Sequence, residues 1–212
     1  MSVATANACA IRPAPWPIIL AALGAFVLLL AVSLAIFGPG ETALLYVARY
    51  SARLSFLIFI LVLVISPLAT LWPSPRSRWL RRQRRYFGLA FALAHFCHLG
   101  ALLWLMNHRG GSLDTVTLVG GGLAYLLIGL MALTSNDFAQ RKMGPRRWRA
   151  LHLTGLTYVW LIFMQSYVGR LLSPTPPEPK LIFVVLTALG VGAVLLRLAP
   201  RLRGRSGRAS PA

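Results

Sequence analysis

The sequence predicts an all-α integral membrane protein, a bundle of six transmembrane helices with both termini in the cytoplasm. Three observations lead to this fold class. Hydrophobic residues make up 57% of the chain and charged residues only 12%, whereas about 25% of residues are charged in soluble domains. The apolar residues gather in six long runs, and arginine and lysine lie mainly in alternate connections between them.

Each apolar run is close to the roughly 20 residues that an α-helix needs to cross a hydrocarbon core about 30 Å thick. Helices are the expected spanning form, because lipid offers no partner for open backbone groups and the runs lack the alternation of barrel strands. The six predicted spans are 16–37, 50–72, 86–106, 115–134, 151–172 and 181–199.

The first run, 16–37, is expected to be a retained span. It exceeds the roughly 7–15 apolar residues of a signal peptide, and no small-residue cleavage site follows it. Prolines mark the ends of other runs, since proline lacks a backbone donor and disfavours helix before it. Pro73 and Pro75 follow the second run, a proline-rich outer loop covers 173–177, and Pro67 is expected to kink the second span.

The positive charge predicts the orientation of the bundle, because cytoplasmic connections are enriched in lysine and arginine. The connections 73–85 and 135–150 and the tail after residue 196 are strongly basic, so we expect all three inside. We expect residues 1–15 to form a cytoplasmic tail, 16–199 the transmembrane domain and 200–212 a basic disordered tail. The formal charge of +18 does not indicate nucleic-acid binding, since no polar folded domain is present to display it.

Two histidines in the third span are the first candidates for a functional site. His95 and His98 are three residues apart, so a helix places them on nearly the same face. Ionisable side chains at this depth are costly and usually functional. The alternatives are a hydrogen bond to a neighbouring helix or ligation of a metal or haem through a ring nitrogen.

A third histidine, His152, begins the fifth span. It is either an interfacial residue that hydrogen-bonds a lipid phosphate or a second ligand. The carboxylates Glu41, Asp114, Asp137 and Glu178 all fall in predicted loops. Proton-coupled transport therefore has little support, because no acidic residue lies within a span to relay protons.

The combined motifs resemble a known family. They are Arg84-Arg85-x-x-Gly88-Leu89 followed by His98, then Leu133-Thr134-Ser135, then Arg141-Lys142-x-Gly144-x-x-x-Trp148-x-x-Leu151-His152. Over residues 50–200 the chain resembles the haem-binding membrane subunit of the periplasmic protein-methionine-sulfoxide reductase, in the ferric reductase-like transmembrane group.

The resemblance implies a b-type haem carrier of the bacterial inner membrane. Such a subunit passes electrons from a quinol or a cytoplasmic flavin reductase to a molybdenum-containing reductase in the periplasm. FMN or a quinone is a second candidate cofactor. The resemblance also implies one haem-ligating histidine on the third helix and two on the fifth, and His98 and His152 match two of these three positions.

The third ligand position departs from the family pattern, since counting thirteen residues on from His152 leads to Gln165. At 1.5 Å per residue, His98 lies ~20 Å above Arg85 and His152 only ~4.5 Å above Arg149, so the two histidines differ by about 15 Å in depth. They are therefore not expected to ligate one iron, and Gln165 is the residue that faces His98 in depth.

Three arrangements of the site follow. An outer haem would use His98, with Gln165, water, Met164 or His95 opposite and with Arg53 and Arg170 beside its propionates. An inner haem would use His152, with Arg84 or Arg85 near its propionates or near a quinone. In the third arrangement, the chain keeps the bundle without haem and is a membrane scaffold or small-molecule permease.

Overall fold

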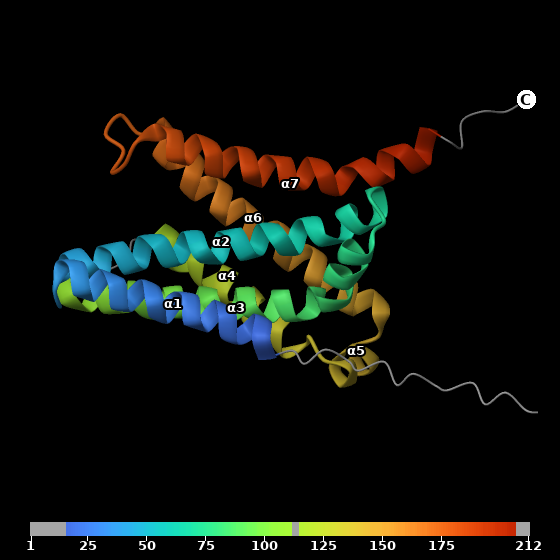
Figure 1. Ribbon diagram of the computed structural model, residues 1–212, viewed down its shortest axis with the longest axis horizontal. Helices are drawn as coiled ribbons and strands as arrows, with labels where there is room; N and C mark the ends of the chain where they lie inside the picture. The colour runs from blue at the N-terminus through green and yellow to red at the C-terminus, as the bar shows by residue number, and fades with distance from the viewer. Residues whose placement is uncertain (1–15, 112–114, 207–212) are drawn as a thin grey trace, which may run out of the picture.

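The structure is a computed structural model that describes residues 16–111 and 115–206 (Figure 1). Within these residues it contains seven α-helices and no β-strand, which confirms the all-α fold class. The helices are α1 (Trp16–Phe37), α2 (Glu41–Leu71), α3 (Pro75–Arg109), α4 (Thr115–Leu133), α5 (Asp137–Met143), α6 (Pro145–Leu172) and α7 (Lys180–Ser206).

Helices α2, α3, α6 and α7 extend beyond the predicted spans, so that part of the expected loop sequence is helical. Helix α3 begins at Pro75 rather than at residue 86, because Ser74 and Ser77 form a capping box and proline is favoured at the first helical position. Arginine is itself a good helix former. The basic connection before the third span is therefore an extension of the helix past its apolar part.

The short helix α5 was not predicted. The Asn136 side chain caps it, accepting a hydrogen bond from the Ala139 backbone N–H at 2.7 Å. It ends at Gly144, whose φ of +77° is a conformation that glycine adopts readily. Only 7 residues long, α5 gives too weak a periodic pattern to be recognised. The chain turns by 104° between α4 and α5.

Four helices among the described residues are long and apolar enough to cross a membrane: α1, α2, α3 and the part of α7 up to Pro200. The bent pair α4 and α5 counts as a fifth span if it is taken together. Helix α6 falls outside this set, since residues such as His152 and Gln165 dilute its apolar character. Six crossings and cytoplasmic termini therefore stay predictions.

The predicted tails lie largely outside the described residues. Residues 1–15 and 207–212 are not described, and α7 continues through Pro200 as far as Ser206. The start of α1, the end of α7 and α5 lie toward the same end of the bundle, on the right in Figure 1. We call this the α5 end.

The core of the bundle lies between α2, α3, α4, α6 and α7. Buried aromatic and aliphatic side chains from these five helices form one cluster, which includes Phe56, Phe59, Phe91, Ile128 and Phe163. Helix α1 contributes no residue to it and packs along the outside against α2 and α3.

Glycine allows α6 and α7 to approach closely. A Cβ atom added at Gly190 would lie 2.7 Å from the Met164 sulfur and 3.6 Å from Phe56 Cζ. The Gly190 carbonyl also accepts a hydrogen bond from Trp160 Nε1 at 2.9 Å. By contrast, a Cβ atom at Gly192, on the same helix, would have nothing within 4 Å.

Gly190→Leu is expected to destabilise the bundle by about 1–3 kcal/mol, because overpacking forces neighbouring side chains and backbone to shift. Gly192→Leu is the matched control and should change stability much less. Unfolding in mixed detergent micelles measures both variants. Equal losses in the two would contradict this description of the α6–α7 contact.

Candidate functional site

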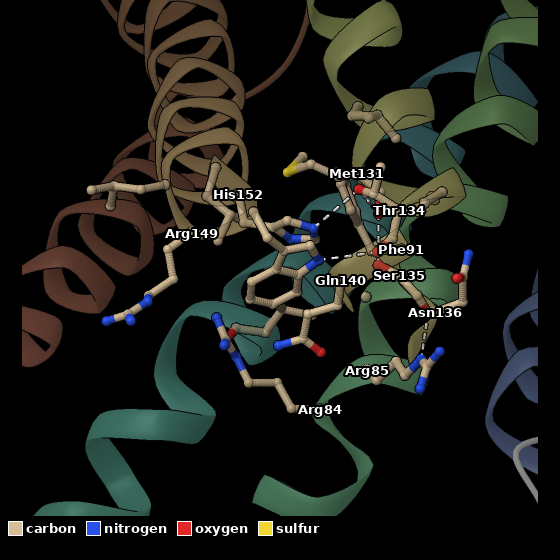
Figure 2. A pocket seen from close by; sticks show the side chains of 18 of the residues that line it. Arg84, Arg85, Phe91, Met131, Thr134, Ser135, Asn136, Gln140, Arg149 and His152 are labelled. Carbon is tan, nitrogen blue, oxygen red and sulfur yellow. Dashed lines mark hydrogen bonds between the residues drawn. The ribbon is translucent and has the colours of Figure 1, made fainter. Parts of the chain in front are cut away.

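A cavity of about 420 Å³ opens at the α5 end of the bundle. Its inner walls are apolar and come from α2, α3, α4 and α6: Val62, Phe91, Ile128, Met131 and Leu156. Its polar side comes from the N-terminal halves of α3 and α6, from the turn between α4 and α5, from α5 and from α7 (Figure 2). The segments predicted to share one side of the membrane thus meet around one cavity.

Four arginines line this cavity: Arg84, Arg85, Arg149 and Arg197. No aspartate or glutamate is among the described residues that line it. The charge of Arg85 is balanced by a residue that does not line the cavity, because Arg85 forms an ion pair with Asp137 at 2.9 Å. Arg85 also donates a hydrogen bond to the Ser135 carbonyl. Arg149 Nε donates to the Pro145 carbonyl, one turn back in its own helix.

Arg84 is half-buried. Its Nε donates to the Val62 carbonyl at 3.3 Å, which fixes the side chain against α2. In Figure 2 it extends from α3 toward Gln140 and His152. Arg197 lies close enough to act on it electrostatically. Two guanidinium groups that repel each other in a low-dielectric site favour an anion beside them.

His152 is held in the cavity by two neighbours. Its ring stacks on Trp148 with 4.1 Å between centroids. Its Nε2 lies 3.4 Å from Thr134 Oγ1, and the Thr134 hydroxyl donates to the Leu130 carbonyl at 2.7 Å. Trp148 Nε1 donates to the Thr134 carbonyl at 3.0 Å, so both contacts of His152 belong to one connected unit.

The predicted pair His95 and His98 lies elsewhere, in the middle of α3. Neither residue lines the cavity. Each is bound through Nδ1 to a serine of α2: His95 to Ser55 at 3.0 Å and His98 to Ser51 at 3.1 Å. The two imidazole centroids are 5.6 Å apart. Among the described residues, no three histidine, cysteine, aspartate or glutamate side chains gather as a metal site.

His98 and His152 are not brought together, in agreement with the depth expected from the sequence. His152 shares the cavity with Gly88 of α3. His98 is ten residues further along that helix, which corresponds to about 15 Å. The two histidines therefore belong to separate sites.

Gln165 does not face His98, because it lies on an exposed face of α6. The buried residues of α6 at this level are Phe163 and Tyr167. Met164 is also buried, but its sulfur packs toward Gly190 of α7. The outer arrangement with Gln165 or Met164 opposite His98 thus gains no support from the fold.

The two outer arginines also have partners. Arg53 forms an ion pair with Glu178, to which Arg49 adds a second contact at 3.5 Å. Arg170 donates hydrogen bonds to Ser166 in its own helix. The Arg53 contact ties α2 to the loop before α7 and accounts for its charge without a haem propionate.

Sequence reasoning missed the polar neighbours of the histidines. Ser51 and Ser55 are four residues apart in an apolar span, and this spacing could have indicated a polar stripe on α2. Trp148 fits an interfacial aromatic residue from sequence alone, whereas in the fold it stacks on His152. Thr134 was recognised only as part of a motif.

The apolar helices define a multi-pass helical membrane protein, and a basic, histidine-containing cavity opens at its α5 end. No family model and no solved structure matches the chain. Curated relatives do match it, and those described here are all named protein-methionine-sulfoxide reductase heme-binding subunit MsrQ.

The chain is 30% identical over 152 residues to the relative from an Enterobacter species, covering 68% of this chain and 72% of that protein. The Yersinia pseudotuberculosis relative is 30% identical over 177 residues, 74% of this chain and 77% of that protein. The Azospira oryzae relative is 35% identical over 121 residues, 48% of each chain. The chain belongs to the MsrQ family.

Proposed function

We propose that this chain is a haem-binding subunit that carries electrons through the membrane to a protein-methionine-sulfoxide reductase. The main observation in support is the cavity at the α5 end, which combines apolar walls, four arginines and His152. The names of the relatives state haem binding for those proteins, and the cavity has the chemistry that a haem requires.

The residues of the cavity fit haem in three ways. The porphyrin ring is flat and apolar, and the deep walls are aromatic and aliphatic. Its two propionates are anionic, and the described residues that line the cavity include four arginines and no aspartate or glutamate. An imidazole is the commonest protein ligand of haem iron in such carriers, and His152 lies on the same cavity.

His152 would hold the iron. The distance between His152 Nε2 and Thr134 Oγ1 is 3.4 Å, whereas N–H···O hydrogen bonds usually measure 2.7–3.2 Å. This contact is therefore weak, and breaking it so that His152 can bind a metal would cost little energy. The stacked Trp148 ring restricts rotation of the imidazole. Haem, when bound, would supply the one-electron redox chemistry that the side chains of this site cannot.

The chain's own residues would bind the group, orient it and exclude water. Apolar walls lower the local dielectric, which strengthens the attraction between arginine and carboxylate. Arg84 is already fixed by Val62 and would lose little side-chain entropy on binding. A quinone or FMN fits the same mixture of apolar wall and arginine and is the alternative occupant.

The remaining assignments extend this proposal. Electrons would enter from a quinol or a cytoplasmic flavin donor at the α5 end, in the bacterial inner membrane. The acceptor would be a molybdenum-containing reductase in the periplasm. The chain would be an electron-transfer subunit of an oxidoreductase rather than a complete enzyme.

Absorption spectra of the purified protein in detergent test the proposal. We expect a Soret band that shifts on dithionite reduction. His152→Ala should lower the affinity for cavity haem by roughly tenfold or more, since even outer-shell changes cost 10–100-fold. His108→Ala is the matched control, because His108 is exposed at the far end of α3 and lines no part of the cavity.

Two results would contradict the proposal. A protein without a Soret band, after expression with added haem precursor, would favour a haem-less scaffold or permease. A His152→Ala variant that titrates with haem as tightly and to the same ratio as the unchanged protein would show that the cavity does not bind the iron.

A further inference from the structure

Helix α5 runs across the end of the bundle rather than along it. Residues 115–134 are a predicted span, and the apolar part of α4 ends at Leu133. The chain then turns by 104° into α5, which Figure 1 shows at one end of the bundle. A helix that crosses a membrane is tilted on average by only about 20° from the membrane normal. The turn therefore directs α5 along the membrane surface.

The two sides of α5 have different surroundings. Gln140 lines the cavity, and it lies about 200° around the helix from both Phe138 and Lys142. Phe138 is 68% exposed, and Leu133, just before the turn, is 74% exposed. The Lys142 ammonium lies 5.9 Å from the centroid of the Phe138 ring. The side of α5 that faces away from the cavity thus carries an apolar ring with a cation beside it.

Four basic side chains lie close together in sequence around this side of α5. Arg141 and Lys142 belong to α5, and Arg146 and Arg147 to the first turn of α6. All four are exposed. Among the residues that the structure describes, none of the four forms an ion pair. We call these four side chains together with Phe138 the α5–α6 surface.

The acidic residues of the described chain cannot neutralise this surface. Three of them fall within 16–111 and 115–206, and each already forms an ion pair with an arginine of another segment: Glu41, Asp137 and Glu178. An uncompensated cluster of one sign of charge attracts ligands of the opposite sign. The α5–α6 surface therefore fits an anionic partner.

The apolar side chains beside these charges favour a lipid surface over a soluble acidic protein. Residues 135–150 connect two predicted spans, so we expect them at the level of the lipid headgroups. Segments with a basic face and exposed Phe or Leu lie in the membrane interface, where the apolar side chains enter the boundary between headgroups and acyl chains. Long lysine and arginine side chains can then reach the phosphates. Phe138 and Lys142 have this arrangement.

We infer that the α5–α6 surface binds the headgroups of anionic phospholipids. Phe138 enters the acyl-chain boundary, and the four basic side chains contact lipid phosphates. One side of α5 thus belongs to the cavity and the other to the membrane. Lipid binding at this surface does not require haem, so it can be tested whatever occupies the cavity.

Lipid titration of the purified full chain in neutral-detergent micelles, followed by native mass spectrometry, measures the binding. We expect phosphatidylglycerol to bind more tightly than phosphatidylcholine. Lys142→Gln should weaken phosphatidylglycerol binding roughly fivefold, the effect of one basic residue near an anionic membrane surface. Lys180→Gln is the matched control, because Lys180 is an exposed lysine at the start of α7, outside the α5–α6 surface. It should change the affinity less than about twofold.

The apolar part of the contact is tested at Phe138. Phe138→Ser should weaken phosphatidylglycerol binding roughly tenfold, because the ring no longer leaves water on binding. Phe138→Leu keeps an apolar side chain and should restore most of the affinity. Glycerophosphoglycerol has the same headgroup without acyl chains and should bind at least about tenfold more weakly than the lipid.

Four results would overturn the inference. Equal affinities for phosphatidylglycerol and phosphatidylcholine would leave an acidic protein as the partner of the basic side chains. Equal effects of Lys142→Gln and Lys180→Gln would indicate a general attraction by total charge. Unchanged binding in Phe138→Ser would exclude contact with the acyl-chain boundary, and glycerophosphoglycerol that binds as tightly as the lipid would indicate a site for soluble phosphate esters.

Discussion

Glu178→Gln is expected to lower the free energy of unfolding by about 3–5 kcal/mol, the cost of removing one partner from a buried ion pair. The Glu178 side chain is 11% exposed and contacts both Arg49 and Arg53. Arg53 is 14% exposed and stacks over Tyr50, so it cannot turn freely toward water. Without the carboxylate, two cations would remain close together near the start of α2.

Asp137→Asn is the matched control for this prediction. It removes a carboxylate from another arginine pair, but the Asp137 side chain is 67% exposed. Exposed pairs contribute about 0.2–1 kcal/mol. Thermal or detergent-induced unfolding in micelles measures both variants. A loss for Glu178→Gln no greater than that for Asp137→Asn would contradict the view that Glu178 fixes the loop before α7 against α2.

Arg84→Gln is expected to weaken haem binding to the cavity about 10–100-fold. A hydrogen bond to a charged group contributes about 1.5–3 kcal/mol, and each 1.4 kcal/mol corresponds to a factor of ten. Arg84 is partly buried, anchored by Val62 and directed toward His152. Its charge therefore acts where solvent screening is weak. Titration of the haem-depleted protein with haem, followed in the Soret region, gives the affinity.

Arg82→Gln tests whether position rather than total charge matters. Arg82 lies two residues away on the same helix, is exposed and does not line the cavity. The affinity should change by less than a factor of about three, since exposed charges are screened by salt. Equal effects of the two substitutions would point to a general attraction of the basic surface and would count against a specific carboxylate site.

Much of the fold could be predicted because a helix that crosses the hydrocarbon core of a membrane needs about 20 apolar residues. Residues 16–37 are the predicted and the observed first helix alike. The first residues of α3 and α6 could not be found in this way, because a helix continues beyond its apolar part wherever caps and helix-forming arginines allow it. Apolarity indicates where the membrane is, whereas Ser74 and Pro75 determine where the helix starts.

The candidate site was predicted in part. Counting rise along the helices correctly separated His98 from His152, and basic segments expected on one side do meet around a cavity. It was harder to predict which residues of α6 lie on the same face of the helix as His152. At 100° per residue, Gln165 is about 220° around the helix from His152, whereas Phe163 and Tyr167 are within about 60° of it. The depth of a residue along the helix axis does not determine its angular position around that axis.

The peripheral position of α1 has an evolutionary consequence. This helix has only two buried residues, Ala22 and Ser33, and it lines neither the cavity nor the histidine pair. Most of its side chains need only be soluble in lipid, a requirement that many apolar sequences meet equally well. Related chains should therefore drift fastest here, while the residues around His152 change slowly.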